Sequence, residues 1–122
     1  MFNSLVGKAV IIAQCNGARH RHVAFILKKK IPVCIGWNKQ KSHPAIERHP
    51  YKPETAHIHA ELDAVIKNGE VDYSQYTMVV MRIKKNGTIA NSKPCLGCQH
   101  VLKQVGFKSV FYSTEYGNFA RL

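Results

Sequence analysis

Two short segments of the sequence carry the residues that could build a zinc centre with a proton carrier beside it. His59 and Glu61 form a His-x-Glu pair, and Cys95 and Cys98 form a Cys-x-x-Cys pair directly after Pro94. One imidazole and two thiolates leave a tetrahedral zinc with its fourth position open for water, which is typical of catalytic zinc. We therefore interpret His59, Cys95 and Cys98 as Zn²⁺ ligands. Glu61 is too close to His59 to be an ideal second ligand, so we assign it the catalytic role of carrying protons.

The two cysteines also allow other interpretations. A closed zinc knuckle could take His57 or His100 as its fourth ligand, and two reduced thiols could simply lie in a core. The open site is favoured because a knuckle has no use for a carboxylate at Glu61.

The segments around these residues indicate two helix starts. Pro94 suits the first turn of a helix, which would place both sulfurs on one face and favour their thiolate forms. This helix is expected over residues 94–105, and the helix that carries Glu61 over residues 59–68. The separation of the two halves, 95 − 61 = 34 residues, leaves room for a strand, which is expected over residues 77–83.

The rest of the chain supplies a first helix and further strands. Residues 4–14 have helical spacing, although their apolar run at 10–12 could also form a strand. Residues 22–27 and 31–37 indicate an antiparallel hairpin with a basic turn, and residues 109–113 a later strand. Residues 39–53 form a long loop before His59 and are expected to be functional. The tail is too short for a crossover helix and a parallel strand, so we predict a hairpin that turns near Gly117 and Asn118.

These motifs resemble the zinc signature of the cytidine deaminase-like superfamily, His-x-Glu followed by Pro-Cys-x-x-Cys. His59, Glu61, Pro94, Cys95 and Cys98 are the matching positions, and the resemblance covers the chain from about residue 20 to its end. It implies an α/β three-layer sandwich with a mixed five-stranded sheet, about three helices and an antiparallel last strand. The order of the expected elements predicts the same sandwich, with both zinc helices on one face. We expect a single zinc-dependent deaminase domain over residues 1–122.

The resemblance also implies roles at the substrate. The backbone N–H of Ala60 would bind the carbonyl of a cytosine base, and the backbone C=O of Lys93 would receive its amino group. Asn38 matches a sugar-contacting asparagine, with a turn residue as the alternative. Tyr112 matches an aromatic residue beside the base, with plain packing as the alternative.

The chain departs from the best-known branches of this superfamily. Residues 91–95 read Asn-Ser-Lys-Pro-Cys where the AID/APOBEC enzymes have Ser-Trp-Ser-Pro-Cys. Residues 59–61 read His-Ala-Glu where free-cytidine deaminases have Cys-Ala-Glu. The short tail resembles free-cytidine deaminases and several bacterial toxin deaminases. The motifs therefore specify the reaction better than the substrate.

The composition of the chain indicates its expected cellular location. No apolar run approaches the length of a membrane span and no signal peptide is recognisable, so we expect no membrane association. Four cysteines could form disulfides, but two are assigned to metal, and Cys15 and Cys34 are expected to lie in apolar surroundings. This pattern favours a reducing, cytoplasmic location. The sequence leaves the oligomeric state open.

The net charge of the chain does not decide between the possible substrate classes. Lys and Arg number 18 against 7 Asp and Glu, a formal charge of +11, which favours a polyanionic partner. The first hypothesis is a cytosine deaminase of single-stranded DNA or RNA, and the alternative is a deaminase of a free nucleotide such as dCMP or cytidine. A third is a non-enzymatic nucleic-acid-binding zinc module. His43, His49 and His57 could bind phosphate or line the pocket.

Overall fold

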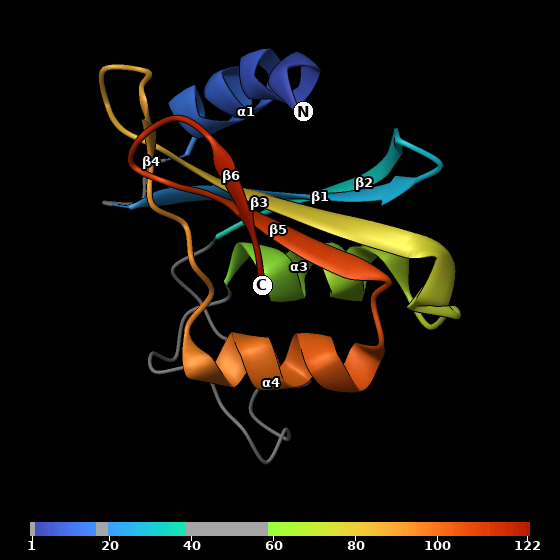
Figure 1. Cartoon of the computed structure of the whole chain (residues 1–122). Coiled ribbons are helices and arrows are strands. Elements are labelled where there is room, and N and C mark those ends of the chain that lie inside the picture. Colours follow the sequence, from blue (N-terminus) through green and yellow to red (C-terminus); the bar gives the residue numbers. More distant parts are fainter. Residues whose placement is uncertain (1, 17–19, 39–58) are drawn as a thin grey trace.

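A computed structural model describes residues 2–16, 20–38 and 59–122 of the chain. The elements in chain order are α1 (Asn3–Gln14), β1 (Arg21–Lys28), β2 (Ile31–Trp37), α3 (Ala60–Asn68), the 3-10 turn η1 (Tyr73–Gln75), β3 (Tyr76–Ile83), β4 (Ile89–Ala90), α4 (Leu96–Val105), β5 (Ser109–Ser113) and β6 (Phe119–Arg121). A mixed sheet lies in the middle, with α1 on one face and α3 and α4 on the other (Figure 1). This arrangement confirms the predicted three-layer α/β sandwich, in which the helix that follows His59 and the helix that follows Cys95 lie on the same face of the sheet.

The sheet has the strand order β2-β1-β3-β5-β6, and β4 adds a sixth strand by pairing with β3. Only β3 and β5 run parallel, because α4 crosses over between them; β6 returns antiparallel to β5. The antiparallel last strand is therefore confirmed, and its turn contains Gly117 at a φ of 83°, where glycine has no Cβ to clash. The prediction of five strands missed β4, which is only two residues long and shows no alternation that a sequence pattern could reveal.

Alternation along β1 explains why helices cover both faces. Val23, Phe25 and Leu27 are buried on the side of α1, whereas Ala24 and Ile26 are buried on the side of α3. A strand buried on both faces appears as a continuous apolar run, as the sequence of β1 does. The predicted hairpin between β1 and β2 is confirmed, with the basic turn at Lys29 and Lys30.

The first layer is a helix rather than the alternative strand. Leu5, Ala9 and Ala13 of α1 are buried at helical spacing against the sheet. Cys15, which follows this helix, is exposed rather than apolar in its surroundings, and Cys34 is half-buried. No helix among residues 2–16, 20–38 and 59–122 is long and apolar enough to cross a membrane. The loop predicted over residues 39–53, with His43, His49 and the nearby His57, lies outside the described residues.

Candidate active site

The predicted metal ligands converge where α3 and α4 begin. The Sγ atoms of Cys95 and Cys98 lie 3.7 and 3.2 Å from His59 Nδ1, and the three ligand atoms all lie within 4.8 Å of one another. Cys98 is fully buried, while His59 and Cys95 are partly exposed. Two segments 34 residues apart in the sequence thus present one N and two S donors to a single point.

Both halves of this cluster occupy the same position on their helices. His59 is the N-cap of α3 and Cys95 is the N-cap of α4, each with an extended backbone. The next turn of each helix starts from them, because Asp63 N donates to His59 O at 2.9 Å and Gln99 N donates to Cys95 O at 2.9 Å. Two helix N-termini therefore point toward the cluster, and their partial positive charges favour thiolates there.

The two thiols differ in how readily they ionise. A hydrogen bond from the Cys98 thiol lowers the pKa of Cys95 to about 3, with a further contribution from His59. The same hydrogen bond, together with burial, raises the pKa of Cys98 far above its usual range. The pair therefore holds a thiolate beside a thiol whose proton a divalent cation would displace.

The donor set fits zinc. Bonds of about 2.0–2.1 Å to nitrogen and 2.3 Å to sulfur, at tetrahedral angles, separate the N and S ligand atoms by about 3.6 Å. The observed 3.7 and 3.2 Å bracket that value. Among the described residues no fourth His, Cys, Asp or Glu joins the group. His100, a candidate fourth ligand of a closed knuckle, instead pairs with Gln104 on the outer side of α4.

Glu61 lies in the first turn of α3, close to the cluster. Its side chain is only 4% exposed. Burial raises the pKa of its carboxyl, which the neighbouring His59 partly opposes. A buried carboxyl group beside an open metal position is placed to exchange protons with a bound water or substrate.

A cavity of about 290 Å³, here called the site cavity, opens onto these groups. Its lining residues are His20, His22, Asn38, His59, Ala60, Glu61, Ser92, Lys93, Pro94 and Cys95. The predicted residues Asn38, Ala60 and Lys93 are therefore brought together with the ligands and Glu61. Sequence reasoning missed His20, His22 and Ser92. A His-x-His pair at the start of a strand was the available signal.

The side chain of Asn38 is held by several hydrogen bonds at the edge of the site cavity. Its Oδ1 accepts hydrogen bonds from His22 N at 2.9 Å and from Asn16 Nδ2 at 3.0 Å, which occupies both lone pairs. Its Nδ2 donates to His20 O at 2.6 Å. One N–H therefore remains for a sugar contact, and the rest of the amide joins β1 to the end of β2.

Tyr112 is not brought into the site cavity. It lies in β5 and is half-buried against the apolar layer under α3 and α4. Its role beside a base stays a prediction.

The start of α3 is fixed by contact with β2. A Cβ on Gly36 would lie 2.4 Å from Ala64 N and 2.6 Å from Ala60 O, so the helix backbone packs directly on this glycine. Beside it, Trp37 N donates to Asp63 Oδ2 at 3.1 Å, and Lys67 forms an ion pair with the same oxygen at 2.8 Å. These contacts set the position of His59 and Glu61 relative to Asn38.

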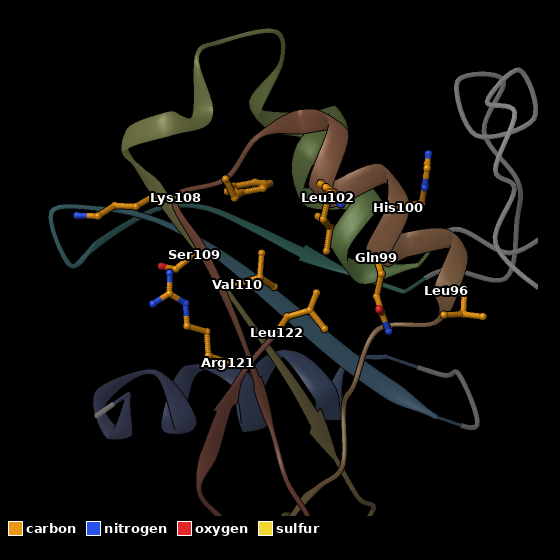
Figure 2. Close-up of a pocket in the computed structure, with 11 residues that line it drawn as sticks. Leu96, Gln99, His100, Leu102, Lys108, Ser109, Val110, Arg121 and Leu122 are labelled. Atoms are coloured by element: carbon orange, nitrogen blue, oxygen red, sulfur yellow. The ribbon is translucent and has the colours of Figure 1, made fainter.

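A second, larger cavity of about 470 Å³ lies between α4 and the strands β5 and β6. We call it the α4 groove; its lining includes Leu96, His100, Lys103, Lys108 and Arg121. Lys108 and Arg121 lie toward one end of it and Leu96 at the other (Figure 2). Of the residues predicted for the deaminase site, none lines this groove within the described part of the chain.

The arrangement of sheet and helices is the cytidine deaminase-like fold. The chain is similar to the dCMP deaminase from the cyanophage S-TIM5 in complex with dCMP and dUMP, with a TM-score of 0.62 and 20% identity over 93% of this chain and 81% of that chain. The apo form of that protein gives a TM-score of 0.57 at 19% identity, over 93% and 86% of the two chains.

A mutant cytidine deaminase from Mycobacterium tuberculosis gives a TM-score of 0.55 at 18% identity, over 93% and 84%. No family model matches the chain, and no curated protein matches its sequence. The similarity therefore rests on the fold.

Proposed function

We propose that this protein is a zinc-dependent hydrolytic deaminase that converts the cytosine of a nucleotide to uracil. The observation that carries the proposal is the cluster of His59, Cys95 and Cys98, with Glu61 buried beside it in the site cavity. A structural zinc site would be closed by a fourth protein ligand and would gain nothing from a buried carboxyl group. The fold of dCMP and cytidine deaminases supports the same reaction class.

The residues of the chain divide the chemistry between them. Zinc held by His59, Cys95 and Cys98 would act as a Lewis acid and lower the pKa of water toward neutrality. Glu61 would take the proton of the attacking water, deliver it to the ring nitrogen, and later protonate the departing ammonia. Water thus replaces the amino group at C4, and cytosine leaves as uracil.

The backbone of the site cavity would orient the base. Ala60 lies at the first position of α3, where helix N–H groups have no partner within the helix, so its N–H suits the base carbonyl. Lys93 precedes Pro94 at the cavity wall, and its C=O would receive the amino group. Asn38 would contribute its remaining N–H to the sugar.

Two substrate classes deserve direct comparison. A free cytosine nucleotide is favoured because the similar structures are named as dCMP and cytidine deaminases, one of them holding dCMP and dUMP. Single-stranded DNA or RNA is the second candidate, favoured by the formal charge of +11, which exceeds what one phosphate needs.

The test is uracil formation from dCMP, cytidine and a cytosine-containing single-stranded oligonucleotide, at low and moderate salt. The zinc-loaded protein is compared with Glu61→Ala, which should keep zinc and form no product. Turnover of dCMP or cytidine alone would support the nucleotide enzyme. Turnover of the oligonucleotide that falls steeply with salt would support a strand substrate. Tight zinc with no product from any substrate would refute the proposal and favour a non-enzymatic zinc module.

A further inference from the structure

His20 lies at the mouth of the site cavity and is held there from two sides. Its backbone carbonyl accepts a hydrogen bond from Asn38 Nδ2 at 2.6 Å. Its Nδ1 lies 2.9 Å from Nη2 of Arg82, in the neighbouring strand β3. The side chain itself is exposed, so it is ordered by its partners rather than by burial.

The contact with Arg82 determines which ring nitrogen of His20 accepts a hydrogen bond and which one donates. A guanidinium group has only N–H donors, so Nδ1 of His20 must be the acceptor and carries no proton. The proton of the neutral imidazole then sits on Nε2, which becomes a donor. Within the described part of the chain, no residue accepts a hydrogen bond from this Nε2. His20 therefore lines the site cavity with one directed N–H.

The same mouth carries a surplus of positive charge. Lys93 is exposed and also lines the site cavity, and Arg82 stands behind His20. No described residue forms an ion pair with either cation. Among the described residues that line the cavity, only Glu61 is acidic, and it is buried. Within the described residues, the site cavity thus combines a buried carboxyl group with exposed or half-buried cations that have no acidic partner.

We propose that His20 and Lys93 bind a phosphate group on the sugar of the substrate, and that Arg82 is the positioning residue that orients His20. This inference rests on the proposed function, because it assigns the substrate of the same cavity to phosphorylated cytosine nucleotides. When the cytosine base lies against Glu61, the phosphate on the sugar extends outward, where the exposed side chains of His20 and Lys93 lie. Hydrogen bonds that join a charged partner are stronger than neutral ones, so a phosphate gains more here than a hydroxyl group would.

A free nucleotide and a strand both present such a phosphate. In dCMP it is a terminal phosphate, and in an oligonucleotide it is a bridging diester with a lower charge. Comparing dCMP, deoxycytidine and an oligonucleotide with one cytosine therefore shows first whether the phosphate is recognised and then which source supplies it.

The experiment measures kcat/KM for dCMP and deoxycytidine in the zinc-loaded protein and in the variants His20→Ala, Lys93→Gln and Arg82→Gln. We expect the wild-type protein to prefer dCMP, and His20→Ala and Lys93→Gln each to lower kcat/KM for dCMP by about tenfold or more. The loss for deoxycytidine should be much smaller, because Lys93→Gln keeps the backbone C=O that would receive the amino group of the base. Arg82→Gln should give a smaller loss of the same kind. Lys85→Gln removes one positive charge from the exposed turn before β4 and should change neither substrate.

Deoxycytidine is the internal control for folding. Equal kcat/KM for both substrates in the wild-type protein would overturn the inference, as would equal losses on both substrates in His20→Ala and Lys93→Gln. If the oligonucleotide alone is turned over and shows the same loss in both variants, the phosphate belongs to a strand and the inference holds. Absence of uracil from every substrate would instead refute the proposed function.

Discussion

The two cavities beside α4 differ in what their size and chemistry imply. The α4 groove has a volume of about 470 Å³, and the site cavity has only about 290 Å³. The groove runs along the side of the helix, where backbone groups are already paired, and it offers separate side chains such as His100, Lys103 and Leu96. The site cavity lies at the N-termini of α3 and α4 and gathers donors from both. Convergence of groups, rather than volume, marks the place for chemistry.

The largest difference between the cavities should be seen in turnover. Glu61→Gln keeps the shape of the side chain but removes the proton carrier, so we expect deamination to fall by about a thousandfold with zinc content unchanged. Lys103→Gln in the α4 groove should leave turnover as it is. The measurement is the rate of uracil formation with zinc content determined on the same samples. A thousandfold loss accompanied by loss of zinc would assign Glu61 to metal binding instead.

Substitution of two cysteines on the same face of the sheet should affect zinc affinity differently. Cys98→Ser removes a buried ligand of the cluster, and we expect zinc affinity to fall by about a hundredfold or more. Cys34→Ser is the matched control, because this half-buried thiol donates a hydrogen bond to the carbonyl of Ala64 in α3 and is not part of the ligand cluster. Competition with a chelator measures both variants. Equal zinc affinity in the two variants would contradict the assignment of Cys98.

Because the backbone of α3 packs directly on Gly36 in β2, a single methyl group added at Gly36 should destabilise the protein. Gly36→Ala places a Cβ against Ala60 and Ala64, so α3 must shift, and we expect a loss of about 2–3 kcal/mol in the free energy of unfolding. Gly7→Ala in α1 meets open space and should stabilise the protein by about 0.5–1 kcal/mol. Denaturant unfolding of both variants measures this. A neutral Gly36→Ala would show that α3 is not fixed by close packing on β2.

The smallest effect concerns pH. Burial lowers the pKa of His22 to about 4 from 6.5, with Arg82 contributing next. The unfolded chain binds this proton first, so the stabilisation is fully present above pH 6.5 and is lost as the pH falls through 4. The loss should amount to roughly 1–3 kcal/mol, and His22→Gln should abolish it. Unfolding of both proteins between these pH values tests the sign, with His100→Gln in the α4 groove as the control. A parallel pH dependence in wild type and His22→Gln would contradict it.

Much of the site was predictable because its donors are short motifs at helix starts. His59, Glu61, Cys95 and Cys98 need only local spacing to be recognised, and the fold brings the two halves together as the sheet order requires. The apolar runs of residues 22–27 and 31–37 likewise predicted two strands of an antiparallel hairpin.

Other parts of the site depend on contacts that no local pattern encodes. Gly36 looks like a turn residue in the sequence, and only the structure shows that α3 packs on it. The pairing of His20 with Arg82 joins residues 62 positions apart, so neither spacing nor composition could indicate it. Asn38 was predicted at the site, but its amide is largely engaged with β1 and Asn16. Close packing and long-range side-chain pairs are set by the tertiary structure alone.

The central claim is tested most directly by the metal dependence of deamination. Protein stripped of metal with a chelator is incubated with dCMP before and after zinc is restored, and uracil nucleotide and ammonia are measured together. We expect no product without zinc, recovery of activity as zinc reaches one ion per chain, and equal amounts of dUMP and ammonia. Full zinc occupancy with neither product would contradict it, and so would unchanged activity after zinc is removed.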